Sequence, residues 1–222
     1  MKILIDFDGT LLDNHALFYS HIHIYPQVKG FRLKSTEESL LYNMPLYGVG
    51  TYYKKYYLPN LDIQEIIEEM NNLLIFSYHN YSSLREGALD LIKFLKKNNH
   101  ELYICSDSQK ESVLIILSRL DLSKFFKLID VNEDYLKSHE GYWELVIDKY
   151  NFKRNQLILI DDSLQNIINA KNSSIKSIGC RNFPFNISDE KELRKCSDLY
   201  VDYFDSYNFK EIESLIRRMS IE

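Results

Sequence analysis

Short apolar runs alternate with longer stretches of helical periodicity along most of this chain of 222 residues. The short runs are rich in Ile, Leu and Val and end at polar or turn-forming residues, which is typical of buried strands. Five such runs, and a weaker one near the C-terminus, predict the strands of one sheet. They cover residues 2–7, 101–106, 126–131, 156–160, 174–180 and 198–204.

Between these runs, apolar residues recur every three or four positions, which predicts amphipathic helices. Ala88, Leu91, Ile92 and Leu95 form the clearest stripe. The sequence Ser108-Gln-Lys-Glu predicts a capping box for the helix that follows it. Strands that alternate with helices predict an α/β protein, namely a doubly wound parallel sheet with right-handed crossovers. The predicted helices cover residues 35–41, 60–74, 84–100, 108–117, 142–150, 166–172 and 209–219.

The segment between the first two strands, residues 11–86, is too long for a single crossover helix. Its periodicity is helical, so we predict a helical cap of residues 14–84 inserted into a core formed by residues 1–13 and 85–222. Residues 42–57 of this insertion hold six of the chain's 17 tyrosines. These tyrosines either form a substrate-facing lip, because Tyr offers stacking area and a hydroxyl, or serve packing within the cap or a dimer contact.

Composition and charge narrow the classes of function. The formal net charge is −5 and no long basic run is present, so we expect no nucleic-acid-binding surface. We expect no membrane span, because no apolar stretch approaches the roughly 18 residues required, and Asp6 interrupts the N-terminal apolar run too early for a signal peptide. Three cysteines without CxxC spacing are typical of reduced thiols, so we expect a cytoplasmic protein; the sequence does not predict its oligomeric state.

Polar residues follow four of the predicted strands, either at or just beyond the point where the strand ends or on the loop that follows it. Because the carboxyl ends of parallel strands meet at one edge of a sheet, we expect these side chains to lie close together. Gly9 allows a sharp turn after the first strand, where the amides of Gly9 and Thr10 can face an anion. In chain order the strand-end residues are Asp6 and Asp8, Ser106, Lys137, and Asp161 and Asp162.

These residues also resemble a known set of motifs. Asp6-Phe-Asp-Gly-Thr10 is similar to the first motif, D-x-D-G-T, of the haloacid-dehalogenase-type phosphohydrolases. Ser106-Asp107, Lys137 and Asp161-Asp162 are similar to the second, third and fourth motifs, and they occur in the same order. The resemblance covers most of the chain and is to the helical-cap branch, which includes phosphoglycolate phosphatases, nucleotidases and β-phosphoglucomutases.

Two positions depart from the family pattern. Ser138 follows Lys137 where the family usually has Pro, so the lysine of the third motif could be another one. Lys127 is the nearest competitor, although it lies inside a predicted strand. Asn166 stands where the fourth motif often has Asp, and the adjacent pair Asp161-Asp162 supplies two carboxylates in its place.

The resemblance implies a role for each residue. Asp6 attacks phosphorus and forms an aspartyl-phosphate, and Asp8 protonates the leaving group and later deprotonates the hydrolytic water. It also implies Mg²⁺, which prefers oxygen ligands, bound by the Asp6 carboxylate, the Asp8 backbone carbonyl and the Asp162 carboxylate, with help from Asp161. The residues expected to contact the substrate are Gly9, Thr10, Ser106, Asp107 and Lys137.

We therefore predict a magnesium-dependent phosphatase that acts on a small-molecule phosphomonoester. A phosphosugar mutase is the nearest alternative, because it forms the same aspartyl-phosphate, and a non-catalytic binding module of the same fold is a third. A haloacid dehalogenase is disfavoured, because such enzymes attack carbon and have no metal site. Asp8 and the Asp161-Asp162 pair would then have no role in the reaction. His21 and His23 lie two positions apart, but no third ligand accompanies them, so we do not expect a metal there.

Overall fold

The computed structural model divides the chain into two compact units. The first contains Met1–Asp13 and Ser83–Glu222, and the second contains Asn14–Ser82. The second unit is thus an insertion into the first, and its regular structure is helical, so the predicted helical cap within an α/β core is confirmed. The structure describes residues 1–13, 20–41, 44–129, 136–181 and 187–219.

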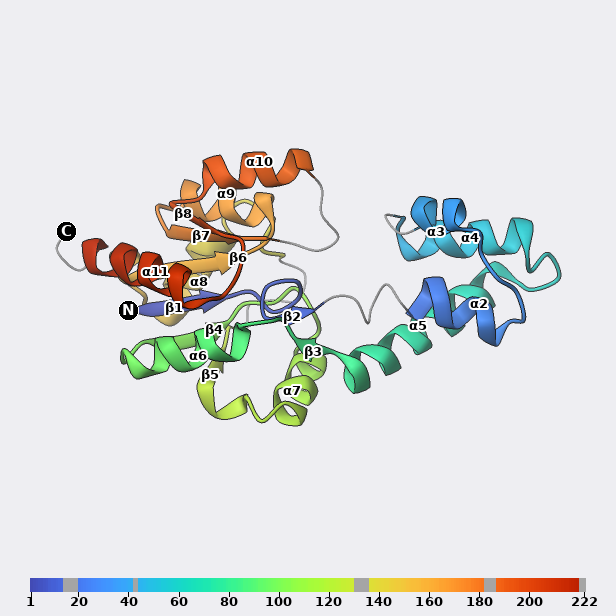
Figure 1. Cartoon of the computed structure of the whole chain (residues 1–222), viewed down its shortest axis with the longest axis horizontal. Helices are drawn as coiled ribbons and strands as arrows, with labels where there is room; N and C mark the ends of the chain where they lie inside the picture. The colour runs from blue at the N-terminus through green and yellow to red at the C-terminus, as the bar shows by residue number, and fades with distance from the viewer. Residues whose placement is uncertain (14–19, 42–43, 130–135, 182–186, 220–222) are drawn as a thin grey trace. The chain divides into compact units, whose positions relative to one another are not determined.

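The core contains a six-stranded sheet in the order β5-β4-β1-β6-β7-β8, and every neighbouring pair is parallel (Figure 1). This confirms the parallel sheet that the alternation of strands and helices predicts. The first strand, β1, lies between β4 and β6, so its end is central in the sheet. The strands are β1 Lys2–Ile5, β4 Glu101–Ile104, β5 Phe126–Leu128, β6 Leu157–Asp161, β7 Lys176–Cys180 and β8 Leu199–Val201.

Apolar residues occupy both faces of this sheet, as expected for parallel strands covered by helices on each side. Leu4 and Leu159 belong to a core cluster with Trp143 and Ile167 of the helices α8 and α9. Their strand neighbours point the opposite way and are also buried. The stripe predicted for α6 is confirmed, because all four of its residues are buried. The core helices are α6 Ala88–Lys97, α7 Lys110–Arg119, α8 Tyr142–Tyr150, α9 Leu164–Asn172, α10 Ile187–Cys196 and α11 Ser206–Met219, with 3₁₀ turns η2 Ser123–Phe125 and η3 Arg154–Gln156.

Three features of the core differ from the sequence prediction. The helix α10 was not predicted, because its sequence is mostly charged and offers almost no apolar stripe. A short antiparallel pair, β2 Leu12–Asp13 with β3 Ser83–Leu84, is too brief to leave a pattern. The strand predicted for residues 126–131 ends at Leu128, and residues 130 and 131 lie outside the described part of the chain.

The cap is a helical unit with its own apolar core. The tyrosine-rich segment supports this core, because Tyr53 is fully buried and its hydroxyl donates to the His21 carbonyl at 2.9 Å. The hydroxyls of Tyr52 and Tyr57 both donate to Glu37, so for these three tyrosines the packing interpretation holds; residue 42 lies outside the described residues. The cap helices are η1 Ser20–Ile24, α2 Tyr25–Val28, α3 Ser35–Leu41, α4 Leu46–Tyr56 and α5 Ile63–Tyr81.

In the part of the chain that the structure describes, no helix has both the length and the apolar character needed to cross a membrane.

Candidate active site

The register of the central strands brings the predicted acids to one edge of the sheet. Ile5 pairs with Ile104 on one side and with Ile160 on the other, so the residues that follow them are level. The Asp6 amide donates to the Ile160 carbonyl at 2.9 Å, which continues the ladder past the end of β1. As a result, carboxylate oxygens of Asp6, Asp161 and Asp162 lie within 4.8 Å of one another.

A lysine ammonium lies inside this acidic cluster. Lys137 Nζ donates to Asp6 Oδ1 and to Asp161 Oδ2, the second at 3.0 Å, and the Lys137 side chain is only 2% exposed. The competing lysine, Lys127, lies on β5 with a side chain that is 65% exposed, and it pairs with Glu101 instead. Of the two candidates, only Lys137 reaches the strand-end acids.

The three carboxylates differ in how many donors already hold them. Asp161 accepts from Lys137, from the Ser163 amide at 2.9 Å and from Asn166 Nδ2 at 3.1 Å to each oxygen. Asn166, which stands where the family often has Asp, therefore orients Asp161. Asp162 accepts from the Thr10 hydroxyl at 3.2 Å. Asp161 has the least remaining capacity to bind a further group, and Asp6 and Asp162 have more.

Asp8 is held separately, by two serine hydroxyls. Ser108 Oγ donates to Asp8 Oδ2 at 2.7 Å, and Ser106 Oγ donates to the same oxygen at 3.3 Å. Ser108 is a site residue that sequence analysis missed. The predicted capping box is wrong, because α7 begins at Lys110 with Gln109 as its N-cap, and the Ser108 hydroxyl turns to Asp8 instead. The signal that could have found it is its position two residues beyond Ser106, at the same strand end.

In the turn after β1, the Gly9 amide makes a hydrogen bond within the turn itself. Gly9 has φ of +85°, as expected for a tight turn, but its N–H donates to the Leu12 carbonyl at 3.1 Å. The Gly9 amide therefore makes a hydrogen bond within the turn, and its contact with an anion stays a prediction. Thr10 is fully buried and directs its hydroxyl to Asp162, and the Cys180 thiol lies 3.6 Å from the same hydroxyl oxygen. Arg85, also missed by sequence analysis, donates to the Gly9 carbonyl at 3.2 Å.

Asp107 lies on the same side of the site as Lys137. Its Oδ1 accepts a hydrogen bond from the Lys137 backbone N–H at 2.9 Å. This carboxylate was expected to contact the substrate. In the structure it contacts the main chain of another site residue, and its contact with the substrate stays a prediction.

Electrostatics indicate that the cluster suits a divalent cation. Burial raises the pKa of Asp6 well above its ordinary value; Lys137 partly offsets this, and the charges of Asp161 and Asp162 add to it. Burial, followed by repulsion from Asp161, raises the pKa of Asp162 to about 7. Three carboxylates and one ammonium leave a formal charge of −2 when all are ionised. Mg²⁺ binds carboxylate oxygens and carries the charge that balances this excess, so the residues present fit the ion.

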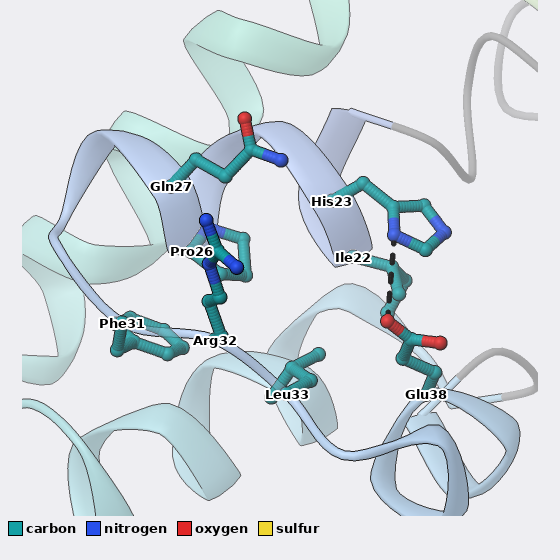
Figure 2. Close-up of a pocket in the computed structure, with 8 residues that line it drawn as sticks. All are labelled: Ile22, His23, Pro26, Gln27, Phe31, Arg32, Leu33 and Glu38. Carbon is teal, nitrogen blue, oxygen red and sulfur yellow. Dashed lines mark ion pairs between the residues drawn. The ribbon is translucent and has the colours of Figure 1, made fainter.

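The cap contains a pocket that shares no residue with the acidic cluster. It has a volume of about 310 Å³. Figure 2 shows apolar side chains together with the ion pair between His23 and Glu38. His23 Nδ1 lies 3.6 Å from the Glu38 carboxylate. His21 and His23 belong to no group of three potential metal ligands within the described residues. The lining residues are Ile22, His23, Pro26, Gln27, Phe31, Arg32, Leu33 and Glu38.

Comparisons with known proteins relate the chain to phosphatases in sequence and to a candidate mutase in fold. The chain is 24% identical over 179 residues to pyrophosphatase PpaX of Oceanobacillus iheyensis, covering 79% of this chain and 80% of that protein. It is 21% identical over 223 residues to a phosphoglycolate phosphatase of Agrobacterium fabrum, covering 97% and 94%. A Thermotoga maritima structure described as a candidate β-phosphoglucomutase shares the fold with a TM-score of 0.78, at 17% identity over 98% of this chain and 99% of that one.

The family model for haloacid dehalogenase-like hydrolases matches residues 3–180, which include every residue of the acidic cluster. The match thus extends from β1 to the end of β7 and spans the cap as well. The prediction of a hydrolase of this type is confirmed, and the chain belongs to the haloacid dehalogenase-like hydrolase family.

Proposed function

We propose that the protein is a magnesium-dependent phosphatase that hydrolyses a small phosphomonoester through a covalent phosphoryl intermediate on Asp6. The observation that carries the proposal is the acidic cluster itself: Asp6, Asp161 and Asp162 lie together at the edge of the sheet, and the Lys137 ammonium pairs with the first two. A second acid, Asp8, is held apart from the cluster by two hydroxyls. A nucleophile, a charge-balancing group and a separate proton donor are the parts that this reaction requires.

In the first step an Asp6 carboxylate oxygen forms a bond to phosphorus while the bond from phosphorus to the ester oxygen breaks. Lys137 holds one Asp6 oxygen, which leaves the other for attack. Asp8 gives a proton to the departing alcohol. Bound Mg²⁺, held by Asp6, the Asp8 carbonyl and Asp162 with Asp161 nearby, would supply charge neutralisation between the carboxylates and the phosphoryl oxygens.

In the second step Asp8 takes a proton from water, and the resulting hydroxide bonds to phosphorus. The bond between phosphorus and the Asp6 oxygen breaks, which releases inorganic phosphate and regenerates the carboxylate. Ser106 and Ser108 keep the Asp8 carboxylate in one place throughout, because both hydroxyls donate to its Oδ2. Lys137 keeps Asp6 oriented in both steps.

The relatives support a small phosphorylated substrate. One is named a pyrophosphatase and another a phosphoglycolate phosphatase, and both align with most of this chain. The structural likeness to a candidate β-phosphoglucomutase favours a second function, phosphosugar mutase, which would use the same Asp6 and Asp8. In a mutase the phosphoryl group passes from Asp6 to a second sugar hydroxyl in place of water.

The test measures inorganic phosphate release from a panel of small phosphomonoesters, including phosphoglycolate, with Mg²⁺ and with chelator. Asp6→Asn should reduce turnover below about one thousandth of wild type, because an amide cannot serve as the nucleophile. The matched control is Asp121→Asn, which changes an exposed carboxylate paired with Lys124 and should leave turnover unchanged. Wild-type rates in Asp6→Asn, or chelator-resistant release, would refute the proposal. Interconversion of hexose phosphates without phosphate release would establish the mutase instead.

A further inference from the structure

Lys137 must hold its ammonium in one place although its backbone lies in no helix or strand. Residues 136–141 form turns, and α8 begins only at Tyr142. The lysine side chain has four flexible carbons, so the ammonium position depends on where the backbone is held. The contacts of the Lys137 peptide groups therefore determine whether the charge reaches Asp6 and Asp161.

One contact acts on the N–H of Lys137. Asp107 lies in the segment that follows β4, and its Oδ1 accepts a hydrogen bond from this N–H at 2.9 Å. The same segment carries Ser106 and Ser108, which hold Asp8. Asp107 thus connects the lysine turn to the strand end that positions the proposed general acid.

A second contact acts on the carbonyl of Lys137. Asn169 of α9 is 8% exposed, and its Nδ2 donates to the Lys137 carbonyl at 3.0 Å and to the His139 carbonyl at 3.3 Å. Its Oδ1 faces Gln165 Nε2 at 3.4 Å, so the amide presents both N–H groups to the turn. The turn is closed on itself, because the His139 N–H donates to the Leu136 carbonyl at 2.9 Å.

The helix α9 also holds the lysine's partner. Asn166 donates to both oxygens of Asp161, and Asn169 lies three residues further along, on the same side of the helix. One rigid helix therefore fixes the Asp161 carboxylate through Asn166 and the lysine backbone through Asn169. The separation between the two members of this ion pair is set by the spacing of the two asparagines.

We propose that Asp107 and Asn169 are positioning residues that hold the Lys137 main chain from both sides and so place its ammonium against Asp6. Asp107 then acts through Lys137, and its contact with the substrate is not required. The proposal deepens the proposed phosphatase function and rests on it for its catalytic consequence. Its structural consequence, order in the lysine turn, does not depend on turnover.

The test uses three variants. Asp107→Ala removes the acceptor at an exposed position, where folding should be unaffected. Asp107→Asn retains an oxygen acceptor without the charge, so it should recover most of what Asp107→Ala loses. Asn169→Asp keeps the side-chain shape but loses both donors. Asp121→Ala, at an exposed position, controls for loss of a surface carboxylate and should behave as wild type.

We expect Asp107→Ala and Asn169→Asp to lower kcat by up to about 100-fold, the scale of a roughly 1 Å misplacement of a catalytic group, while the Kd for Mg²⁺ changes less than about threefold. Hydrogen exchange of the 136–141 segment should accelerate in both variants, and the ¹⁵N resonance of the Lys137 ammonium should shift. Equal loss in Asp107→Asn and Asp107→Ala would overturn the proposal in favour of a charge or substrate role for Asp107. Unchanged exchange in the turn and an unshifted resonance would overturn it as well. If wild type hydrolyses no ester, the proposed function fails, and the exchange and resonance measurements still decide the positioning role.

Discussion

Replacing Lys137 with Met tests how the buried charges of the site balance one another. The Lys137 side chain is 2% exposed and donates to both Asp6 and Asp161. Met has a similar length and no charge, so the substitution removes the ammonium with little change in volume. The variant then contains three carboxylates whose oxygens lie within 4.8 Å of one another and no cation among them.

The size of the effect follows from these distances. At an effective dielectric constant of about 20, two unit charges 4.8 Å apart interact with about 3.5 kcal/mol, and charges 3.0 Å apart, as for Lys137 and Asp161, with about 5.5 kcal/mol. Desolvation of the ammonium offsets part of this attraction. Breaking a buried ion pair by removing one partner costs about 3–5 kcal/mol, so we expect a loss of that size in the free energy of unfolding at pH 8 without metal.

The loss in free energy of unfolding caused by Lys137→Met should grow as the pH rises. The pKa values of Asp6 and Asp162 are higher in the folded protein than in the unfolded chain. The stability that these two groups contribute is therefore fully present below about pH 4, the unfolded value. It is lost as the pH rises through the folded-state pKa values, which for Asp162 is about 7. Lys137 lowers both values, and removing it extends the loss to higher pH. The difference between wild type and Lys137→Met should therefore be larger at pH 8 than at pH 5.

Denaturant unfolding in chelator, followed by the fluorescence of Trp143, measures this difference, because Trp143 is the chain's one tryptophan and is buried in the core unit. Lys127→Met is the matched control: its pair with Glu101 is exposed and screened by solvent, so its loss should change stability little. A loss in Lys137→Met no larger than in Lys127→Met, or a loss that is greater at pH 5, would refute the charge balance described here.

Three further predictions concern the metal, its surroundings and a backbone turn. Mg²⁺ affinity, measured by calorimetry, should rise by at least about tenfold per pH unit below 7, because Asp162, and Asp6 whose pKa is also raised, must lose their protons to bind; a flat profile would contradict this. Thr10→Val should weaken Mg²⁺ binding about tenfold, because Asp162 loses its hydroxyl donor, and Thr10→Ser should not; equal affinities in the two variants would count against it. Gly87→Ala should lower the free energy of unfolding by at least about 2 kcal/mol, because φ is +76° and a Cβ would lie 2.0 Å from the Phe204 carbonyl oxygen. The control is Gly30→Ala, where φ is +80° and no atom lies within 4 Å; it should lower the free energy of unfolding by about 1 kcal/mol.

The strand-end acids could be located from sequence because their placement depends on a local rule. A buried parallel strand has a readable apolar pattern, and the residue after it lies at the sheet edge. Asp6 and Asp161 meet because Ile5 and Ile160 are paired. The order of the strands was not predicted, since the pattern shows where strands lie and not which are neighbours.

Residues that act through turns were harder to predict. The Ser108-Gln-Lys-Glu sequence is compatible both with a helix cap and with a loop that turns its hydroxyl toward another strand end, and only the position of Asp8 decides between them. Lys137 was identified by its position on the loop after the predicted strand 126–131 together with the family resemblance, because its place in a turn follows from no periodicity. Asn169 looks like an ordinary polar helix residue until the lysine turn is seen against it.

The short pair of β2 and β3 changes how the insertion should be regarded. Asp13 lies opposite Ser83 and Leu12 opposite Leu84 in an antiparallel ladder, at the two points where the chain leaves the core and returns. To the core, the whole cap is therefore the loop of a β-hairpin. A hairpin requires only that its two strand ends meet, and a two-residue turn such as Asn-Gly satisfies this as well as a folded unit does. The pairing at this junction thus sets no requirement on the length of the cap, and we expect a chain in which such a turn joins Asp13 to Ser83 to retain the acidic cluster.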